Sequence, residues 1–318
     1  RTPMDTRQIE YLLKIAEENN ITRAAEKLHL TQPALNQQLL RLERELGLPL
    51  FHRSRTDWRP TQAGEIYLEN ARKMLQIKQE TYKRLGDLAA RQKGTLSLAF
   101  TPGRGTTMFS YVYPRFHQKY PDIIVEPSEL SVRKQQTLIA RGELDLGFQT
   151  LCDEHRTDDE YLLLATEEIF LIVPKGHPVC EGFPTPRRKK GARQPVFPEL
   201  DIRQLQYEPF VLMYRESTIR QLVDELFAQA GFTPNVLFET ASNATILTMI
   251  RGRLCCGLIP AHYLQKPDKS LACFSLTSHP TWDIVASYRK GTYLPKAARY
   301  FIELASAYWN AEGEEMPG

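Results

Sequence analysis

The chain has 318 residues, which is enough for two or three domains, each with its own core. Hydrophobic residues make up 42% of it, and no apolar run approaches the roughly 18 residues that predict a membrane-spanning helix. The net charge of +3 is small, so a surface that binds nucleic acid must gather its basic residues locally.

The cysteines and histidines predict no metal site and no cofactor. The five cysteines contain no C-x-x-C pair, and the seven histidines lack the spacing of metal ligands. This cysteine usage fits a reducing compartment, and the first residues lack an apolar signal core, so we expect a cytoplasmic protein. Cys180 is the candidate for a redox-sensing thiol, whereas Cys255 and Cys256 lie in an apolar strand and are expected to be inert.

Short helices are predicted at the start of the chain. Apolar side chains recur at helical spacing over residues 5–19, which indicates a first helix. A short second helix follows, with Thr22 as its expected N-cap. The successive alanines Ala24 and Ala25 would let another helix approach it closely. His29 and Leu30 then turn the chain.

The third helix has the composition of a helix that reads base edges in DNA. Thr31 is its expected N-cap, Pro33 lies in its first turn, and Gly47 ends it. One stripe is apolar and consists of Leu35, Leu39, Leu42 and Leu46. The other face carries amides, a small apolar side chain and a cation, which can bond adenine, thymine and guanine edges. The candidates for DNA contact are Thr31, Gln32, Pro33, Ala34, Asn36, Gln37 and Arg41.

An arginine-rich loop follows this helix. Arg53, Arg55 and Arg59 come directly after Leu50-Phe51, in a position to reach phosphates or a narrow minor groove. The alternative is an ordinary polar, solvated helix face followed by a charged loop. The helix and the loop together favour a winged helix-turn-helix that places a helix in the major groove.

The same stretch resembles the winged helix-turn-helix of LysR-type transcriptional regulators. The matching positions are Ala24-Ala25, Leu28, Thr31-Gln32-Pro33-Ala34-Leu35, Leu42-Glu43, Leu46-Gly47, Leu50-Phe51, Arg53 and Thr61-x-Ala63-Gly64. The chain departs from the family where Thr31 and Asn36 replace the usual Ser, where Arg55 stands one place early, and where Pro60 replaces an apolar residue. The resemblance implies a DNA-binding domain over residues 4–63 and an α/β protein overall.

A long helix is predicted over residues 64–93 as a linker. Tyr67, Ala71, Met74 and Ile77 recur at three- and four-residue steps with charges between them. On a single helix, such an apolar stripe would be exposed to water, so we expect it to pair with a second copy of the chain. The alternative is packing on its own domain. The resemblance implies a dimerisation helix, and a homodimer or homotetramer would match an interrupted palindrome in double-stranded DNA.

From Gly94 onward strands and helices alternate, which predicts an α/β domain with a largely parallel sheet over residues 94–318. We expect a first subdomain over about 94–166 and 277–310, and a second subdomain, inserted between these segments, over about 167–276. The expected strands are 95–100, 123–130, 144–149, 169–174, 210–213, 236–240, 255–259 and 283–288. The expected helices run to about 119 and over 133–141, 218–230, 243–251 and 295–309.

Two such subdomains form a cleft, and ligands bind near the carboxyl ends of strands and the N-termini of helices. The loops 101–106 and 214–218 offer hydroxyls, backbone N–H groups and a cation, which suits a carboxylate or similar anion. The alternative is that they are ordinary caps and turns. The candidate effector-binding residues are Thr101, Gly103, Arg104, Ser131, Gln149, Arg215, Ser217, Thr218 and Asn243.

This half also resembles its family counterpart, an effector domain similar to type 2 periplasmic binding proteins. The matching segments are 141–146, 173–178 and 257–260. The resemblance implies that Thr101, Gln149, Ser217 and Thr218 lie where effectors bind. Cys255 departs from it by replacing the first of two glycines.

The expected function is therefore a ligand-responsive transcriptional regulator and not an enzyme, because no nucleophile elbow, carboxylate pair or metal constellation is evident. The alternative is a redox-sensing or constitutive DNA-binding regulator without a small-molecule effector. The basic run Arg187–Arg193 is either a solvated loop or an extra contact to DNA or RNA polymerase.

Overall fold

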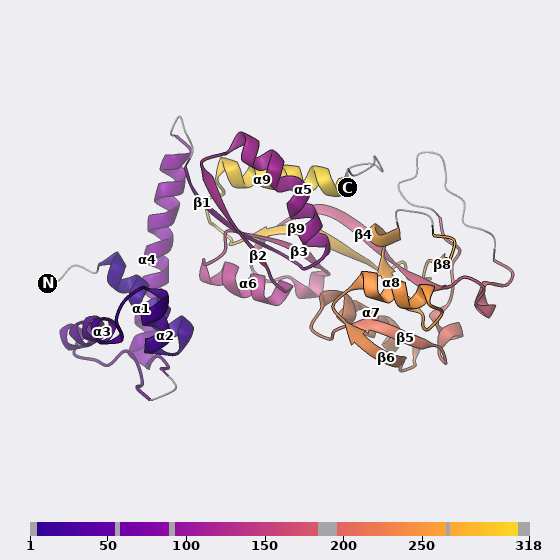
Figure 1. Ribbon diagram of the computed structural model, residues 1–318, viewed down its shortest axis with the longest axis horizontal. Coiled ribbons are helices and arrows are strands. Elements are labelled where there is room, and N and C mark those ends of the chain that lie inside the picture. The colour runs from indigo at the N-terminus through magenta and orange to yellow at the C-terminus, as the bar shows by residue number, and fades with distance from the viewer. Residues whose placement is uncertain (1–4, 55–57, 89–92, 184–195, 265–267, 311–318) are drawn as a thin grey trace. The chain divides into compact units, whose positions relative to one another are not determined.

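The computed structural model describes residues 5–54, 58–88, 93–183, 196–264 and 268–310 (Figure 1). They belong to two compact units, 1–90 and 91–318, which are described in turn. No described helix is long and apolar enough to cross a membrane. The run Arg187–Arg193 and Arg55 lie outside the described residues.

The first unit is helical. Its helices are α1 (Thr6–Glu18), α2 (Ile21–Lys27), α3 (Gln32–Leu46) and α4 (Gln62–Gly86). Their apolar stripes meet in one core that also includes the buried Leu50, Phe51 and Trp58 from the segment after α3. The alanine pair of α2 is fully buried, as a close helix–helix approach requires.

The ends of these helices follow local sequence signals. Thr31 caps α3 by accepting a hydrogen bond from the Ala34 amide at 3.3 Å, and Gly47 ends the helix with φ +69°, so both predictions are confirmed. The prediction of Thr22 as the cap of α2 was wrong. Asn20 is the cap, because its carboxamide oxygen accepts from the amides of Thr22 and Arg23. The expected stripe on α3 also fails at Leu46, which is 46% exposed where the helix ends.

Helix α4 changes character along its length. In its first half, Gly64, Leu68 and Ala71 are buried in the first unit. Farther on, the apolar side chains are exposed, and they include Met74, Ile77, Tyr82, Leu85 and, just past the helix end, Leu88. Within the described part of one chain, this stripe stays largely uncovered.

The second unit contains a seven-stranded sheet and a two-stranded sheet (Figure 1). The large sheet has the order β2-β1-β3-β9-β4-β7, and β8 also pairs with β4. Its strands are β1 (Gly94–Phe100), β2 (Ile123–Glu129), β3 (Leu146–Leu151), β4 (Glu160–Pro174), β7 (Gly257–Pro260), β8 (Leu271–Phe274) and β9 (Thr281–Tyr288). The small sheet pairs β5 (Pro209–Met213) with β6 (Asn235–Thr240) in parallel.

The prediction of a largely parallel sheet was wrong for the large sheet. β1 runs parallel to β2 and β3, but β9 lies antiparallel to β3 and β4, and β4 lies antiparallel to β7 and β8. The sheet is mixed because the chain returns through β9 to the first subdomain. The third expected strand also begins two residues later than predicted, at Leu146.

Helices cover both faces of each sheet. The helices are α5 (Arg104–Lys119), α6 (Val132–Arg141), α7 (Thr218–Ala230), α8 (Asn243–Arg251) and α9 (Lys296–Asn310). α5 and α9 pack on the face of β1 that carries Leu96, Leu98 and Phe100, while α6 packs on the opposite face at Ala99 (Figure 1). α7 and α8 flank β5 in the same way, since its successive residues enter two different cores.

Strand β4 joins the two subdomains. Its first part, to Glu168, pairs with β9, and from Ile169 onward it pairs with β7 and β8. Its register shifts between Leu163 and Ala165, where a bulge bends the strand. The sequence predicted only the second part of this strand.

Candidate DNA-binding face and effector site

Helix α3 presents a polar face to solvent. Leu35, Leu39 and Leu42 fix the helix from behind because they are buried in the core of the unit. Asn36 is half-buried, and Arg41 pairs with Glu45 one turn later at 3.1 Å. The remaining predicted DNA contacts on this helix are exposed, namely Thr31, Gln32, Pro33, Ala34 and Gln37.

The wing is a short antiparallel turn. Phe51 and Pro60 form a bridge, and the His52 amide donates to the Arg59 carbonyl at 2.8 Å. The two described arms of the wing therefore run antiparallel, and Arg53 and Arg59 are both exposed on them.

Glu43 positions the wing, a role that sequence reasoning missed. Its carboxylate is 8% exposed and accepts the Leu50 amide at 2.8 Å and the Phe51 amide at 3.4 Å. It also forms an ion pair with Arg53, whose guanidinium lies 5.9 Å from the Trp58 ring centre. Arg53 thus anchors the wing, and its charge is partly neutralised by a neighbour on α3.

In the second unit, sheet register brings three of the predicted effector-binding residues to one edge. Phe100 pairs with Glu129 and with Phe148, so the parallel strands β2, β1 and β3 end side by side. Thr101, Ser131 and Gln149 lie at or just beyond these carboxyl ends. Such an edge is where ligands of α/β sheets bind.

Gln149 is the most unusual of these residues. Its side chain is 1% exposed, and neither its Nε2 nor its Oε1 finds a hydrogen-bond partner among the described residues. Gln135 is buried beside it, with its Oε1 similarly unsatisfied. Both amides converge on Gly147, where an added Cβ would lie 2.8 Å from Gln135 Oε1 and 3.0 Å from Gln149 Nε2. A buried amide atom without a partner costs about 1–3 kcal/mol, so this edge of the sheet suits a polar ligand that can bond to these amides.

The second subdomain reaches this edge through α7. The Thr218 hydroxyl, at its first residue, donates to the Thr150 carbonyl of β3 at 2.7 Å. Ser217 is the cap of α7, and Ser131 is the cap of α6. The N-terminus of α5 differs, because Gly103 stands at the cap position with φ +78° and supplies no side-chain hydrogen bond.

Arg104 lies deeper than a ligand-binding cation was expected to lie. It is 6% exposed, and its Nη1 donates to Glu167 Oε1 at 2.5 Å. Its guanidinium lies 5.0 Å from the Trp309 ring centre and 5.4 Å from that of Trp282, and its Nε and Nη2 have no described hydrogen-bond partner. Arg104 therefore joins α5 to β4 at the boundary of the subdomains.

Electrostatics in this cluster favour one charge state. Burial raises the pKa of Glu167, but the Arg104 charge and hydrogen bonds from Arg104 and Trp282 outweigh it, so the pKa lies below its ordinary value. Burial and then the Arg104 charge lower the pKa of His262 to about 4. The cluster thus holds an ionised Glu167 and a neutral His262 at neutral pH.

Two predicted residues are not brought to the strand ends by any contact between described residues. Arg215 is 78% exposed at its side chain and lies 3.6 Å from Glu239 Oε1. Glu239 also binds the buried Arg220, a residue that the sequence did not single out. Asn243, at the start of α8, is buried, and its Oδ1 has no described partner.

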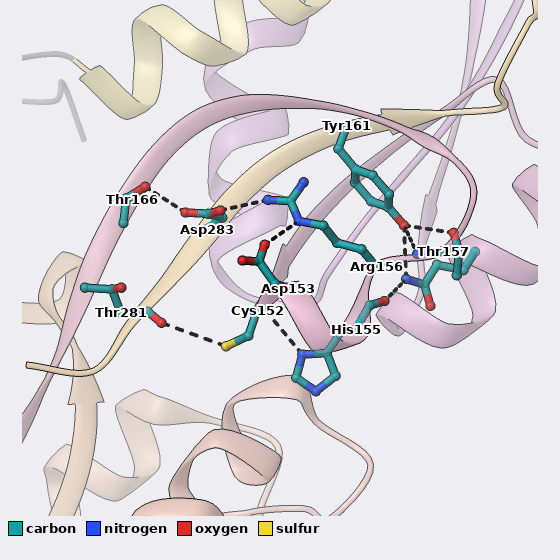
Figure 2. A network of polar contacts seen from close by, with 10 residues as sticks. Cys152, Asp153, His155, Arg156, Thr157, Tyr161, Thr166, Thr281 and Asp283 are labelled. Carbon is teal, nitrogen blue, oxygen red and sulfur yellow. Dashed lines mark hydrogen bonds and ion pairs between the residues drawn. The ribbon is translucent and has the colours of Figure 1, made fainter. Parts of the chain in front are cut away.

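The segment after β3 is held by a polar network (Figure 2). Arg156 donates to Asp153 at 2.9 Å and to Asp283 at 2.8 Å, and the Asp283 carboxylate also accepts the Thr166 hydroxyl at 2.7 Å. Cys152 lies in this network, with its thiol directed to the Thr281 carbonyl at 3.8 Å. Burial, followed by nearby carboxylates, raises the pKa of the Cys152 thiol to about 11.

The other cysteines are free thiols in apolar surroundings. Burial raises the pKa of Cys255 to about 11 and that of Cys256 and Cys273 to about 12. Cys255 and Cys256 are therefore protonated core residues, as expected. Cys180 is half-buried against the same apolar cluster as Phe274.

Both units match known families. Residues 6–65 match the family described as "Bacterial regulatory helix-turn-helix protein, lysR family". Residues 89–310, more than half of the chain, match the family described as "LysR substrate binding domain". The chain belongs to the LysR family of transcriptional regulators. This LysR-type regulator therefore has a helix-turn-helix DNA-binding domain and an effector-binding domain.

Relatives and solved structures agree over nearly the whole length. The regulator is 29% identical to the uncharacterized HTH-type transcriptional regulator YcgK of Bacillus subtilis, over 95% of this chain and 94% of that protein. It is 27% identical to the Hca operon transcriptional activator HcaR of Escherichia coli, over 95% and 97% of the two chains.

The fold is that of full-length LysR-type proteins. A full-length OxyR variant from Pseudomonas aeruginosa aligns with a TM-score of 0.67 at 20% identity, over 95% of this chain and 98% of that one. CbnR in complex with its target DNA aligns with a TM-score of 0.55 at 22% identity, over 95% and 99%.

Proposed function

We propose that a small anionic effector, such as a carboxylate, binds between the subdomains and changes how the regulator binds promoter DNA. The observation that carries this proposal is Gln149, a buried amide whose donor and acceptor have no described partner at the strand ends. The neighbouring α5 N-terminus has no side-chain cap, so its backbone N–H groups suit an anion.

Each subdomain contributes part of the proposed site. Arg104 and Arg215 are each paired with a glutamate, so this proposal assigns them no direct bond to the effector. The hydrogen bond from Thr218 to Thr150 gives effector binding a route to move one subdomain against the other. The residues proposed to contact the effector are Thr101, Gly103, Ser131, Gln149, Ser217 and Thr218.

Gln149→Leu tests the site. Removing an unsatisfied buried amide should leave the free protein as stable as before or slightly more stable, by about 1 kcal/mol. The same change should abolish the thermal shift that carboxylates produce in the parent protein. A metabolite screen by thermal shift, with a substitution at the exposed Gln204 (Gln204→Leu) as control, measures both effects. A ligand shift that survives in Gln149→Leu would contradict the proposal.

Coupling to DNA is the second part of the proposal. A homodimer or homotetramer would place two α3 helices on an interrupted palindrome, with the exposed stripe of α4 as the pairing surface. Gln32→Ala or Asn36→Ala should reduce discrimination between operator variants more than affinity for unrelated DNA, as measured by competitive binding. An effector that leaves both DNA affinity and footprint unchanged would overturn the coupling, because coupling is reciprocal. In that case a constitutive or redox regulator remains, and Cys180→Ser is the next variant.

A further inference from the structure

Three side chains with metal-binding atoms gather in the turn after β3. Cys152 directly follows β3, and the short helix η1 (Asp153–His155) carries Glu154 and His155. One ligand atom from each of Cys152, Glu154 and His155 lies within 4.8 Å of the others. The spacing C-x-E-H is compact, and none of the three residues belongs to the proposed effector site.

The donor atoms define the class of ion. A thiol sulfur, an imidazole nitrogen and a carboxylate oxygen suit zinc and its transition-metal neighbours, whereas calcium and magnesium prefer oxygen alone. Three protein ligands leave the fourth tetrahedral position to water. Cys152 and His155 are half-buried and Glu154 is exposed, so an ion can enter from solvent.

The imidazole of His155 is already oriented for this role (Figure 2). Its Nδ1 accepts the Cys152 amide at 3.2 Å, so the lone pair points to the cysteine side. Its Nε2 then carries the proton and donates to Gln221 Oε1 on α7. Metal-bound histidines have this arrangement, with one nitrogen on the ion and the other N–H on a fixed acceptor.

The surroundings hold the turn in place and leave one carboxylate for the ion. Arg156 forms ion pairs with both Asp153 and Asp283, and the Gln136 amide donates to the His155 carbonyl at 2.7 Å. Glu154, by contrast, forms no ion pair with a described residue.

We propose that Cys152, Glu154 and His155 bind one divalent transition-metal ion of the zinc class. On binding, the ion forms bonds to the Cys152 sulfur, His155 Nδ1 and a Glu154 oxygen. The thiol proton leaves to solvent, and the Cys152 amide releases Nδ1.

The bound ion fixes the turn against α7 through Gln221. Because Thr218 of α7 also bonds β3 at Thr150, the ion acts on the same contact between the subdomains as the proposed effector. The site itself goes beyond that function and does not rest on it.

Cobalt titration of the full-length, tag-free protein tests the site. One Co²⁺ per chain should bind and produce thiolate-to-cobalt charge-transfer absorption in the near ultraviolet. Cys152→Ser should abolish this absorption, while Cys180→Ser, at another half-buried thiol of the unit, should retain it. Absorption that persists in Cys152→Ser, or none in the parent protein at tenfold excess of Co²⁺, would overturn the proposal.

Two further variants separate ligation from folding. Glu154 and Gln221 are exposed, so Glu154→Gln and Gln221→Leu should unfold at the parent temperature in the absence of metal. Each should weaken Zn²⁺ affinity, by about 10–100-fold for the positioning residue Gln221. Unchanged Zn²⁺ affinity in both variants, measured by competition with a chromophoric chelator, would contradict this geometry.

Discussion

Each unit of the regulator contains a glutamate–arginine pair, and the two pairs differ in burial and in sequence separation. In the DNA-binding unit, Glu43 is buried but Arg53 is 38% exposed, ten residues away. In the effector unit, Arg104 and Glu167 are 6% and 7% exposed and stand 63 residues apart. The first pair shapes a local loop that water still reaches. The second holds two subdomains together where water cannot compensate for a lost partner.

Arg104→Met should have the largest effect on stability. It leaves the Glu167 carboxylate buried without its cation, which costs about 3–5 kcal/mol of unfolding free energy. Denaturant unfolding of the effector unit measures this loss, and Arg251→Met, at a half-exposed ion pair, should cost no more than about 1 kcal/mol. The double variant Arg104→Met/Glu167→Leu should recover much of the loss. If the stability losses of the two single substitutions simply add in the double variant, the pair acts through packing alone.

Acid should destabilise the effector unit. The pKa of His262 is about 4 in the folded state and 6.5 ordinarily, so the unfolded chain binds more protons between these values. Stability should therefore fall by up to about 3 kcal/mol as the pH falls from about 6.5 to about 4. Because the pKa of Glu167 is lowered, stability should fall further as the pH drops below 4.5. His262→Gln should flatten this pH dependence in denaturant titrations, whereas the exposed His279→Gln should not.

Gly64→Ala should disrupt the DNA-binding unit. An added Cβ would lie 2.0 Å from the Leu50 carbonyl oxygen, which is backbone and cannot rotate away. The expected loss is about 1–3 kcal/mol, together with a displaced wing. Gln62→Ala, exposed in the same turn of α4, should change stability by no more than about 0.5 kcal/mol. Equal unfolding midpoints for the two variants would mean that this close approach is not present in solution.

Arg53→Met should have the smallest effect on stability and a clear effect on DNA binding. The cost should be about 1 kcal/mol, because Arg53 itself is 38% exposed and the buried Glu43 carboxylate keeps the Leu50 and Phe51 amides as hydrogen-bond donors. Affinity should fall for all DNA sequences, and the salt slope should decrease by about 1 if Arg53 also reaches a phosphate. Binding isotherms at several salt concentrations measure this slope. A loss confined to one operator would assign Arg53 a base contact instead.

Features that depend on neighbours in sequence were predictable. The limits of α3 follow from a hydroxyl cap at Thr31 and a left-handed glycine at Gly47, both within one turn of the residues they affect. The limits of α7 and α8 were predicted correctly for similar reasons, since Ser217 and Ser242 cap them. Strand β8 was missed because four residues are too few to show a period.

Features that depend on distant residues were not predictable. The first part of β4 alternates too weakly to be recognised and exists because β9 pairs with it. Arg104 was expected in a loop over 101–106 but is the first residue of α5, and its partner Glu167 could not be inferred from either segment alone. Cys152, Glu154 and His155 were not recognised as a ligand set in the sequence, because only the fold of the turn brings their ligand atoms together.

The sequence by itself determined the family, the helix-turn-helix, and the alternation of strands and helices in the effector unit. It could do so because caps, periodicity and short motifs act over a few residues. Tertiary structure decided which polar side chains have hydrogen-bond or ion-pair partners. It paired Arg53 with Glu43 and buried Arg104 against Glu167, and it left the Gln149 amide without a described partner at the strand ends. The physical reason is that burial and hydrogen-bond satisfaction depend on residues brought together from distant segments, and these set the free energy of a polar group.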